Sequence, residues 1–360
     1  MSASGSATTG QRGNAFDLLR LTAALLVIVD HSWVITGHPG FPLAGGSGTD
    51  LGQLAVGMFF LLSGYLVSSS WLADPSLRRF AGRRLLRIYP AYAVVILLLV
   101  FLAGPLFSAS GGYFRQTGTW RFLGDNLLII PMQYTLPGIF AHTPYPLVAD
   151  GSLWTIRVEL CCYAGVAILG VLTLARRKWV LFGLAVLGLA VATAIHVTGY
   201  QGMLVHDLLG QDAAQPIAYF GLGMVARAFR PGAPPPLWLL PATALSWALA
   251  WGTPLAALGA ILFVSTLTFT IAFRAPGALH RPTGSYDLSY GTYLLAFPVQ
   301  EILADLGIRE FAPHAILTAI IVLPLAALSW RLVERPALRF KPARPKLSGD
   351  RVRVDAESPA

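Results

Sequence analysis

The chain has 360 residues, of which 55% are hydrophobic and only 12% are charged, and its formal net charge is +9. Because soluble domains carry about 25% charged residues, this composition excludes an ordinary soluble enzyme and predicts a polytopic membrane protein. The basic residues stand in short segments between apolar runs, which is the pattern of cytoplasmic loops and not of a nucleic-acid-binding surface.

Apolar runs of about 20 residues predict about ten transmembrane helices. In chain order the runs are 16–35, 51–71, 88–107, 152–174, 179–197, 213–229, 237–251, 254–273, 285–306 and 312–333. A further apolar stretch, 122–133, is too short to span and is expected to be re-entrant or interfacial. Five arginines follow the second run, and the links after the fourth, sixth, eighth and tenth are also basic. The positive-inside rule therefore predicts that both termini are cytoplasmic.

The expected fold is all-α, a polytopic membrane helix bundle in the plasma membrane. A membrane domain over 14–340 lies between two cytoplasmic tails, 1–13 and 341–360, whose polar composition predicts disorder.

The first apolar run, FDLLRLTAALLVIVDHSW, contains ionisable side chains, which are costly in a bilayer and therefore indicate a functional site. Arg20 and His31 are eleven residues apart, so their side chains leave a helix on nearly the same side, roughly 16 Å apart along its axis. We interpret them as two ends of one polar cavity. Histidine titrates close to neutral pH, which makes His31 the leading catalytic candidate. The alternative is that Arg20 reaches the lipid headgroups and His31 caps a polar loop.

The segment RRLLRIYPAY opens the third run with closely spaced arginines. Arg84 and Arg87 are three residues apart and share a helix face at the predicted cytoplasmic boundary. Guanidinium groups suit phosphate oxygens, so these two residues and Arg83 are candidate ligands of coenzyme A, whose pantetheine arm would reach inward. The alternative is a role in topology and contact with anionic lipids.

Four residues elsewhere are further candidates. In DGSLWTIRVEL, the aromatic face of Trp154 and the carboxylate of Glu159 suit a sugar on the acceptor side; the alternatives are an interface anchor and a buried ion pair with an arginine. Ser63 in FFLLSGYL either lets two helices approach closely or gives a substrate access to the cavity. Asp287 either lines the cavity or packs against other helices. We count Glu159 among the catalytic candidates and Trp154, Ser63 and Asp287 among the substrate-binding ones. No spacing in the chain is typical of a metal site.

Over about 14–340, the chain resembles the acyltransferase family 3 membrane proteins. The resemblance is carried by six motifs in this order: FDLLR with its Arg-x10-His pair, FFLLSGYL, RRLLRIYPAY, LWTIRVE, SYGTYLL and LVERP. The resemblance implies a ten-span bundle that moves an acyl group from a cytoplasmic acyl-CoA to a hydroxyl of an extracytoplasmic carbohydrate or glycolipid. The expected donor is acetyl-CoA. The resemblance also implies that Arg20 and His31 are the family's Arg-x10-His pair and that Arg84 and Arg87 are its Arg-x-x-Arg pair. Many members carry a histidine where this chain has Ala296 or Phe297.

Two other functions compete with acyl transfer. A transporter or flippase for a lipid-linked glycan would use the polar cavity as a permeation path, and a membrane scaffold would perform no chemistry. An arginine pair at the donor side of a buried histidine favours the acyltransferase. Its expected partners are membrane lipids, acyl-CoA and the carbohydrate acceptor, with no metal and no nucleic acid; the oligomeric state is left open.

Overall fold

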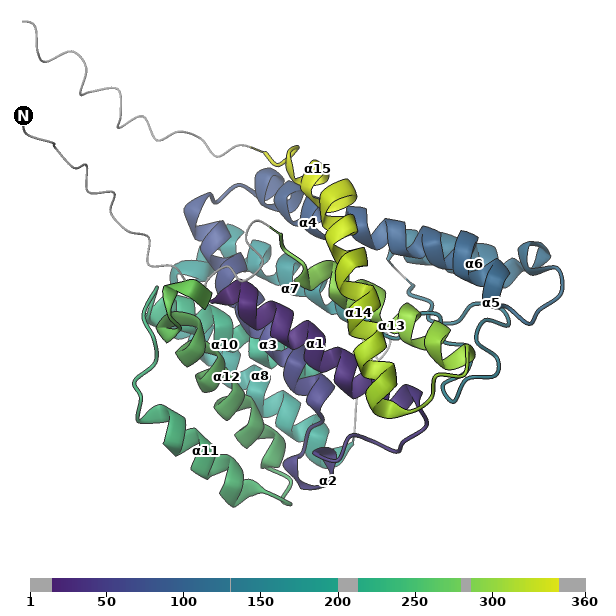
Figure 1. Ribbon diagram of the computed structural model, residues 1–360. Coiled ribbons are helices and arrows are strands. Elements are labelled where there is room, and N and C mark those ends of the chain that lie inside the picture. Colours follow the sequence, from purple (N-terminus) through teal and green to yellow (C-terminus); the bar gives the residue numbers. More distant parts are fainter. Residues whose placement is uncertain (1–14, 130, 200–212, 280–285, 343–360) are drawn as a thin grey trace, which may run out of the picture.

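The computed structural model describes residues 15–129, 131–199, 213–279 and 286–342, and this part of the chain consists of helices and loops without a β-strand (Figure 1). The prediction of an all-α membrane protein is confirmed. By length and composition, seven helical segments in the described ranges can cross a membrane. They contain α1 (Phe16–Ile35), α3 (Leu51–Ala73), α4 (Leu77–Leu98), α7 (Trp154–Val171), α8 (Lys178–Thr198), α12 (Ala256–Arg274) and α14 (Phe311–Ser329).

Three shorter helices occupy the remaining predicted spans. They are α10 (Ala214–Phe229), α11 (Leu239–Ala250) and α13 (Ser289–Asp305). The count of ten spans and the cytoplasmic position of the termini stay predictions. The N-terminal tail 1–13 and residues 343–360 of the C-terminal tail lie outside the described residues.

The connections contain short helices as well. Helix α2 (Ala44–Ser47) precedes α3, and α6 (Thr117–Leu128) occupies much of the stretch expected to be re-entrant or interfacial. Figure 1 shows α6 beside the far end of α4, away from the middle of the bundle. Its Trp120 and Leu128 are exposed, so α6 presents apolar side chains outward.

Two helices are longer than the sequence predicted. The predicted third span began at residue 88 after a basic link, but α4 already begins at Leu77, so the arginines of that link lie on the helix itself. Arginine is a good helix former, which explains the extension. Beyond Leu98, α4 continues through a π-helical turn into α5 (Gly104–Phe107), and α14 continues through the π-helical turn Trp330–Glu334 into α15 (Arg335–Leu338).

Helices α1 and α3 lie in the middle of the bundle, with α10 and α12 on one side and α13 and α14 on the other (Figure 1). Small residues bring α3 and α10 together: a Cβ on Gly64 would lie 2.1 Å from the carbonyl oxygen of Phe220, and a Cβ on Gly223 would lie 2.1 Å from that of Leu61. Because any side chain there would separate the backbones, this contact fixes α3, which carries side chains of both cavities described below.

Candidate active site

The bundle contains two adjoining cavities. The first, of about 600 Å³, is lined by four arginines and one lysine and is called the basic cavity here. The second, of about 750 Å³, is lined by five aromatic side chains together with His31 and is called the aromatic cavity. Arg20, near the start of α1, and Lys341, after α15, both line the basic cavity, so the two ends of the described chain meet at that end of the bundle.

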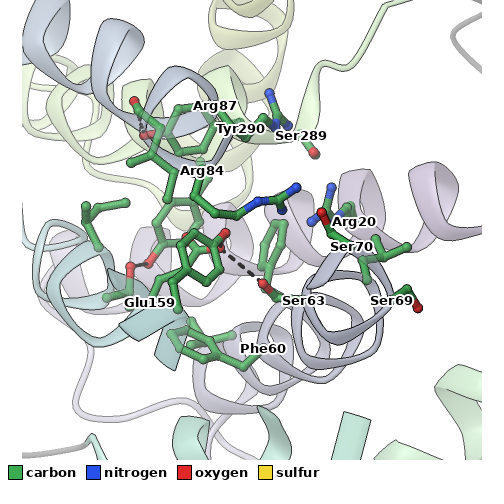
Figure 2. A pocket seen from close by; sticks show the side chains of 18 of the residues that line it. Arg20, Phe60, Ser63, Ser69, Ser70, Arg84, Arg87, Glu159, Ser289 and Tyr290 are labelled. Atoms are coloured by element: carbon green, nitrogen blue, oxygen red, sulfur yellow. Dashed lines mark hydrogen bonds between the residues drawn. The ribbon is translucent and has the colours of Figure 1, made fainter. Parts of the chain in front are cut away.

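Two guanidinium groups in the basic cavity have capacity to bind an anion. The side chain of Arg84 lies against the rings of Tyr163 and Phe80, 5.7 and 6.0 Å from their centroids, and points toward Arg20 (Figure 2). In both arginines the Nε atom is buried without a hydrogen-bond partner among the described residues. Since a buried donor without a partner is unfavourable, this pair is suited to an anionic ligand.

Two further cations line the same cavity, and the sequence analysis did not identify either. Arg227 of α10 donates a hydrogen bond from Nε to Ser69 Oγ at 2.7 Å. Partial burial and the nearby guanidinium groups of Arg87 and Arg84 lower the pKa of Lys341. The part of this lowering that comes from Arg87 and Arg84 is due to like-charge repulsion, and a bound polyanion would reduce that repulsion.

Arg87 also borders the basic cavity, but its charge is already paired. Its Nη2 lies 2.5 Å from Asp287 Oδ2, just before α13, and its Nη1 lies 2.9 Å from Glu334 Oε2, between α14 and α15. The predicted donor ligand Arg87 and the predicted substrate ligand Asp287 therefore meet as an ion pair that joins α4 to α13.

The structure does not bring Arg83 to either cavity. Adjacent residues on a helix point about 100° apart, and Arg83 turns away from Arg84 to bind Asp74, with Nη1 2.7 Å from Oδ2. Arg79 binds the same carboxylate at 2.6 Å. These two guanidinium groups hold the pKa of Asp74 well below its usual range. Arg83 is buried in the protein. Its ion pair with Asp74 therefore links the start of α4 to the turn that follows α3.

The carboxylate of Glu159 lies in the basic cavity and not beside Trp154. Tyr163 and Ser63 both donate hydrogen bonds to Glu159 Oε1, the second at 3.3 Å (Figure 2). Trp154 lines the aromatic cavity instead. The sequence analysis grouped the two residues, but five helical positions correspond to a rotation of about 140° and a rise of about 7.5 Å. Glu159 is therefore the acidic group on the side of the arginines.

His31 lies in the aromatic cavity. Its ring stands edge-on to Phe297, with centroids 5.5 Å apart at 82°, and its Nδ1 is buried without a hydrogen-bond partner among the described residues. Phe297 thus lies next to His31 at the place where the family resemblance would allow a second histidine. Asp30 packs against the start of α3, where a Cβ on Gly52 would lie 2.6 Å from Asp30 Oδ2. That contact fixes the end of α1 that carries His31.

The rest of the aromatic cavity suits a ring-shaped polar ligand. Its aromatic side chains are those of Tyr134, Tyr145, Trp154, Tyr293 and Phe297. Arg157 of α7 lines it as well and has a buried Nε without a partner among the described residues. Aromatic faces combined with polar groups can bind both the apolar faces and the hydroxyls of a sugar.

The two cavities share a thin wall. Val56 and Tyr293 line both of them. The Tyr293 hydroxyl lies 2.9 Å from Thr155 Oγ1, and its ring stands edge-on to Phe59. The sequence analysis expected Arg20 and His31 in a single cavity. The structure places Arg20 in the basic cavity and His31 in the aromatic cavity, and Val56 and Tyr293 form the boundary that the two cavities share.

Comparison with known proteins identifies the family. The family model described as an acyltransferase domain matches residues 14–331. The chain belongs to acyltransferase family 3. This membrane acyltransferase is 29% identical to an O-acetyl transferase of Shigella phage Sf6, over 94% of this chain and 99% of the relative. It is 30% identical to nodulation protein 10 of Rhizobium leguminosarum bv. viciae, over 93% of this chain and 95% of the relative.

A third relative matches only a part of this acyltransferase. The acyltransferase MdmB of Streptomyces mycarofaciens is 30% identical over 32% of this chain and 27% of its own length. No solved structure matches the chain significantly. In the described residues, no group of three or more histidine, cysteine, aspartate or glutamate side chains is arranged to hold a metal ion. The family match supports acyl transfer over the transporter and scaffold alternatives.

Proposed function

We propose that this acyltransferase moves an acyl group from acyl-CoA, bound in the basic cavity, to a hydroxyl of a carbohydrate or glycolipid, bound in the aromatic cavity. The preferred acyl group in this proposal is acetyl. One observation carries the proposal: Arg20 and Arg84, whose buried Nε atoms have no hydrogen-bond partner among the described residues, line one cavity, and His31 lines the cavity that adjoins it. The name of the Shigella phage relative, an O-acetyl transferase, supports an acetyl group and an oxygen acceptor.

The basic cavity suits the donor because its charge is mostly unpaired. Coenzyme A carries several phosphate charges, and Arg84 and Arg20 would bind them with charge-assisted hydrogen bonds, assisted by Arg227 and Lys341. The ion pairs of Arg87 and Arg83 would hold α4 so that Arg84 keeps its position. The thioester end of the donor would then extend inward, along Phe59 and Ile156, to the wall.

The reaction at the wall forms one bond and breaks another. The acceptor hydroxyl oxygen attacks the thioester carbonyl carbon, the new C–O bond forms, and the C–S bond breaks to release coenzyme A. His31 accepts the hydroxyl proton as a general base, and that proton then neutralises the thiolate. Alternatively, a ring nitrogen of His31 attacks the thioester carbonyl carbon, and the C–S bond breaks to release the coenzyme A thiolate. The acceptor hydroxyl oxygen then attacks the acyl group, the C–N bond breaks, and the hydroxyl proton ends on the thiolate. Glu159, hydrogen-bonded to Tyr163, would orient groups on the donor side.

The direction of transfer follows from the predicted topology. The arginine-rich start of α4 borders the basic cavity, so the positive-inside rule places that cavity at the cytoplasmic face. The aromatic cavity, where Trp154 would stack on the acceptor sugar, would then open to the extracytoplasmic side of the plasma membrane. The acyl group would cross the membrane within the protein, while donor and acceptor stay on their own sides.

The test uses the full chain purified in detergent. The protein is mixed with radiolabelled acetyl-CoA and a glycolipid extract from the source cells, and both free thiol and labelled glycan are measured. Transfer by the unmodified protein and its loss in His31→Ala are expected. Absence of thiol release and glycan labelling, with glycolipid movement across reconstituted vesicles, would refute acyl transfer and favour a flippase.

A further inference from the structure

The wall between the two cavities contains two buried side chains. Val56 and Tyr293 are 8% and 7% exposed, and both line both cavities. Tyr293 is held by its contacts with Thr155 and Phe59. Val56 is held by its place within α3, which is packed against α10 through Gly64 and Gly223. A dense wall of this kind resists changes in the volume next to it.

The acyl group of the donor must reach this wall for the reaction to occur. The basic cavity is lined by cations and, together with Val56, by the apolar side chains of Phe59, Phe60 and Ile156. Phe60 lies one helical turn beyond Val56, on the same face of α3. Val56, Phe59, Phe60 and Ile156 therefore offer an apolar surface to the alkyl part of a short acyl chain.

We propose that Val56 sets the length of the acyl chain that the protein accepts, with the ring of Tyr293 as the opposite side of the same constriction. This inference rests on the proposed function, because it assigns a residue to the acyl end of the donor. Each additional methylene of the acyl chain must fit between Val56, Tyr293 and the aromatic side chains of α3. The γ-methyl groups of Val56 then decide whether the thioester carbonyl can still reach the acceptor hydroxyl.

The chemistry of the transfer is the same for every chain length. One thioester C–S bond breaks, one ester C–O bond forms, and the hydroxyl proton ends on the released thiol. Selection therefore appears as a ratio of kcat/KM values between two acyl-CoA donors. A single methylene in an apolar pocket changes such a ratio about 10- to 200-fold.

The experiment compares acetyl-CoA and propionyl-CoA as donors for the full-length protein in detergent, with the same glycolipid acceptor. Val56→Ala removes two methyl groups from the constriction and should raise the propionyl-to-acetyl ratio of kcat/KM by about tenfold or more. Val56→Ile adds a methyl group and should lower that ratio. The two variants change the volume in opposite directions, so a folding defect in one of them leaves the other as the test.

Two controls separate chain-length selection from other effects. Leu66→Ala makes a similar truncation on the same helix and in the same cavity, but about 15 Å from Val56, and should leave the ratio unchanged. Tyr293→Phe keeps the ring and removes the hydroxyl, so it should leave the ratio unchanged even if it slows transfer.

The possible outcomes distinguish the inference from the function on which it rests. A ratio that moves in opposite directions in the two Val56 variants, and stays constant in Leu66→Ala, supports the inference. Transfer from both donors with an unchanged ratio in Val56→Ala and Val56→Ile overturns the inference and leaves acyl transfer intact. A shift in Leu66→Ala equal to that in Val56→Ala also overturns it. No transfer by the unmodified protein from either donor overturns the proposed function.

Discussion

Arg84 and Arg87 lie one helical turn apart and are expected to respond in opposite ways to the same substitution. Arg84 forms no ion pair among the described residues, and its Nε lacks a hydrogen-bond partner there. Arg87 is bound by Asp287 and Glu334. Replacing each arginine in turn with glutamine therefore separates a donor ligand from a group that holds helices together.

The contacts give the expected magnitudes. Arg84→Gln leaves no carboxylate unpaired and removes one charge-assisted contact to a donor phosphate, which contributes about 1.5–3 kcal/mol. That corresponds to about a ten- to hundredfold weaker affinity for coenzyme A. Arg87→Gln leaves Glu334, whose side chain is 1% exposed, without its cationic partner. Breaking a buried pair in this way lowers the free energy of unfolding by about 3–5 kcal/mol.

The assay measures both quantities on the same detergent preparations. Affinity for coenzyme A is measured by calorimetric titration, and stability is measured by the thermal unfolding midpoint without ligand. Arg84→Gln should bind coenzyme A more weakly and unfold at the same midpoint temperature as the unmodified protein. Arg87→Gln should unfold at a lower midpoint temperature. Adding Asp287→Asn and Glu334→Gln to Arg87→Gln removes the unpaired charges and should restore most of the stability.

Two results would contradict this reasoning. If Arg87→Gln unfolds at the normal temperature and loses as much coenzyme A affinity as Arg84→Gln, Arg87 is a donor ligand and not a group that holds helices together. If Arg84→Gln keeps the normal affinity, the basic cavity does not bind the donor through this guanidinium.

Three further predictions concern other residues. His31→Ala should abolish transfer at normal expression and a normal unfolding midpoint, since it removes the only imidazole described in either cavity; substantial transfer by this variant would exclude both catalytic roles. One alanine inserted after Leu25 should rotate His31 by about 100° relative to Arg20 and abolish transfer, and retained activity with α1 still inserted would show that the two residues do not serve one reaction. Burial raises the pKa of Asp150, in the loop before α7, to about 7. Because the folded state then binds its proton more tightly than the unfolded state, stability should fall as pH rises from about 4 to about 7. Asp150→Asn keeps the acceptor for Ser152 and should weaken this pH dependence of the unfolding midpoint; an unchanged dependence would exclude Asp150 as its source.

Local sequence patterns predicted the helices well because apolar length and basic links are properties of single segments. They also singled out Arg20 and His31, since ionisable groups in an apolar run are conspicuous. Periodicity could separate Arg83 from Arg84, but it could not say which of the two faces a cavity. That depends on Asp74, which binds Arg83, and on Tyr163, which lies against Arg84.

Contacts between distant segments were beyond the reach of the sequence. The partners of Arg87 lie 200 and 247 residues away, and neither Arg227 nor Lys341 stands in a motif that links it to α4. Tyr163 was within reach, since it follows Glu159 by four residues and therefore shares its helix face. The wall between the cavities was beyond the reach of the sequence, because it is formed by Val56 of α3 and Tyr293 of α13, which are more than 200 residues apart in the chain.

The separation of the two cavities also has an electrostatic consequence for His31. A polyanionic donor requires several cations, but a general base beside them would be hindered from accepting a proton. At an effective dielectric constant of about 20, two unit charges repel by about 4 kcal/mol at 4 Å and by about 1 kcal/mol at 16 Å. The eleven-residue spacing of Arg20 and His31 gives roughly the larger distance. This spacing keeps both groups on one side of α1, so a donor held at Arg20 can extend toward the wall that adjoins the cavity of His31, and it spares His31 most of the repulsion. A spacing of four residues would keep the side, but its rise of about 6 Å would raise the repulsion to about 2.8 kcal/mol.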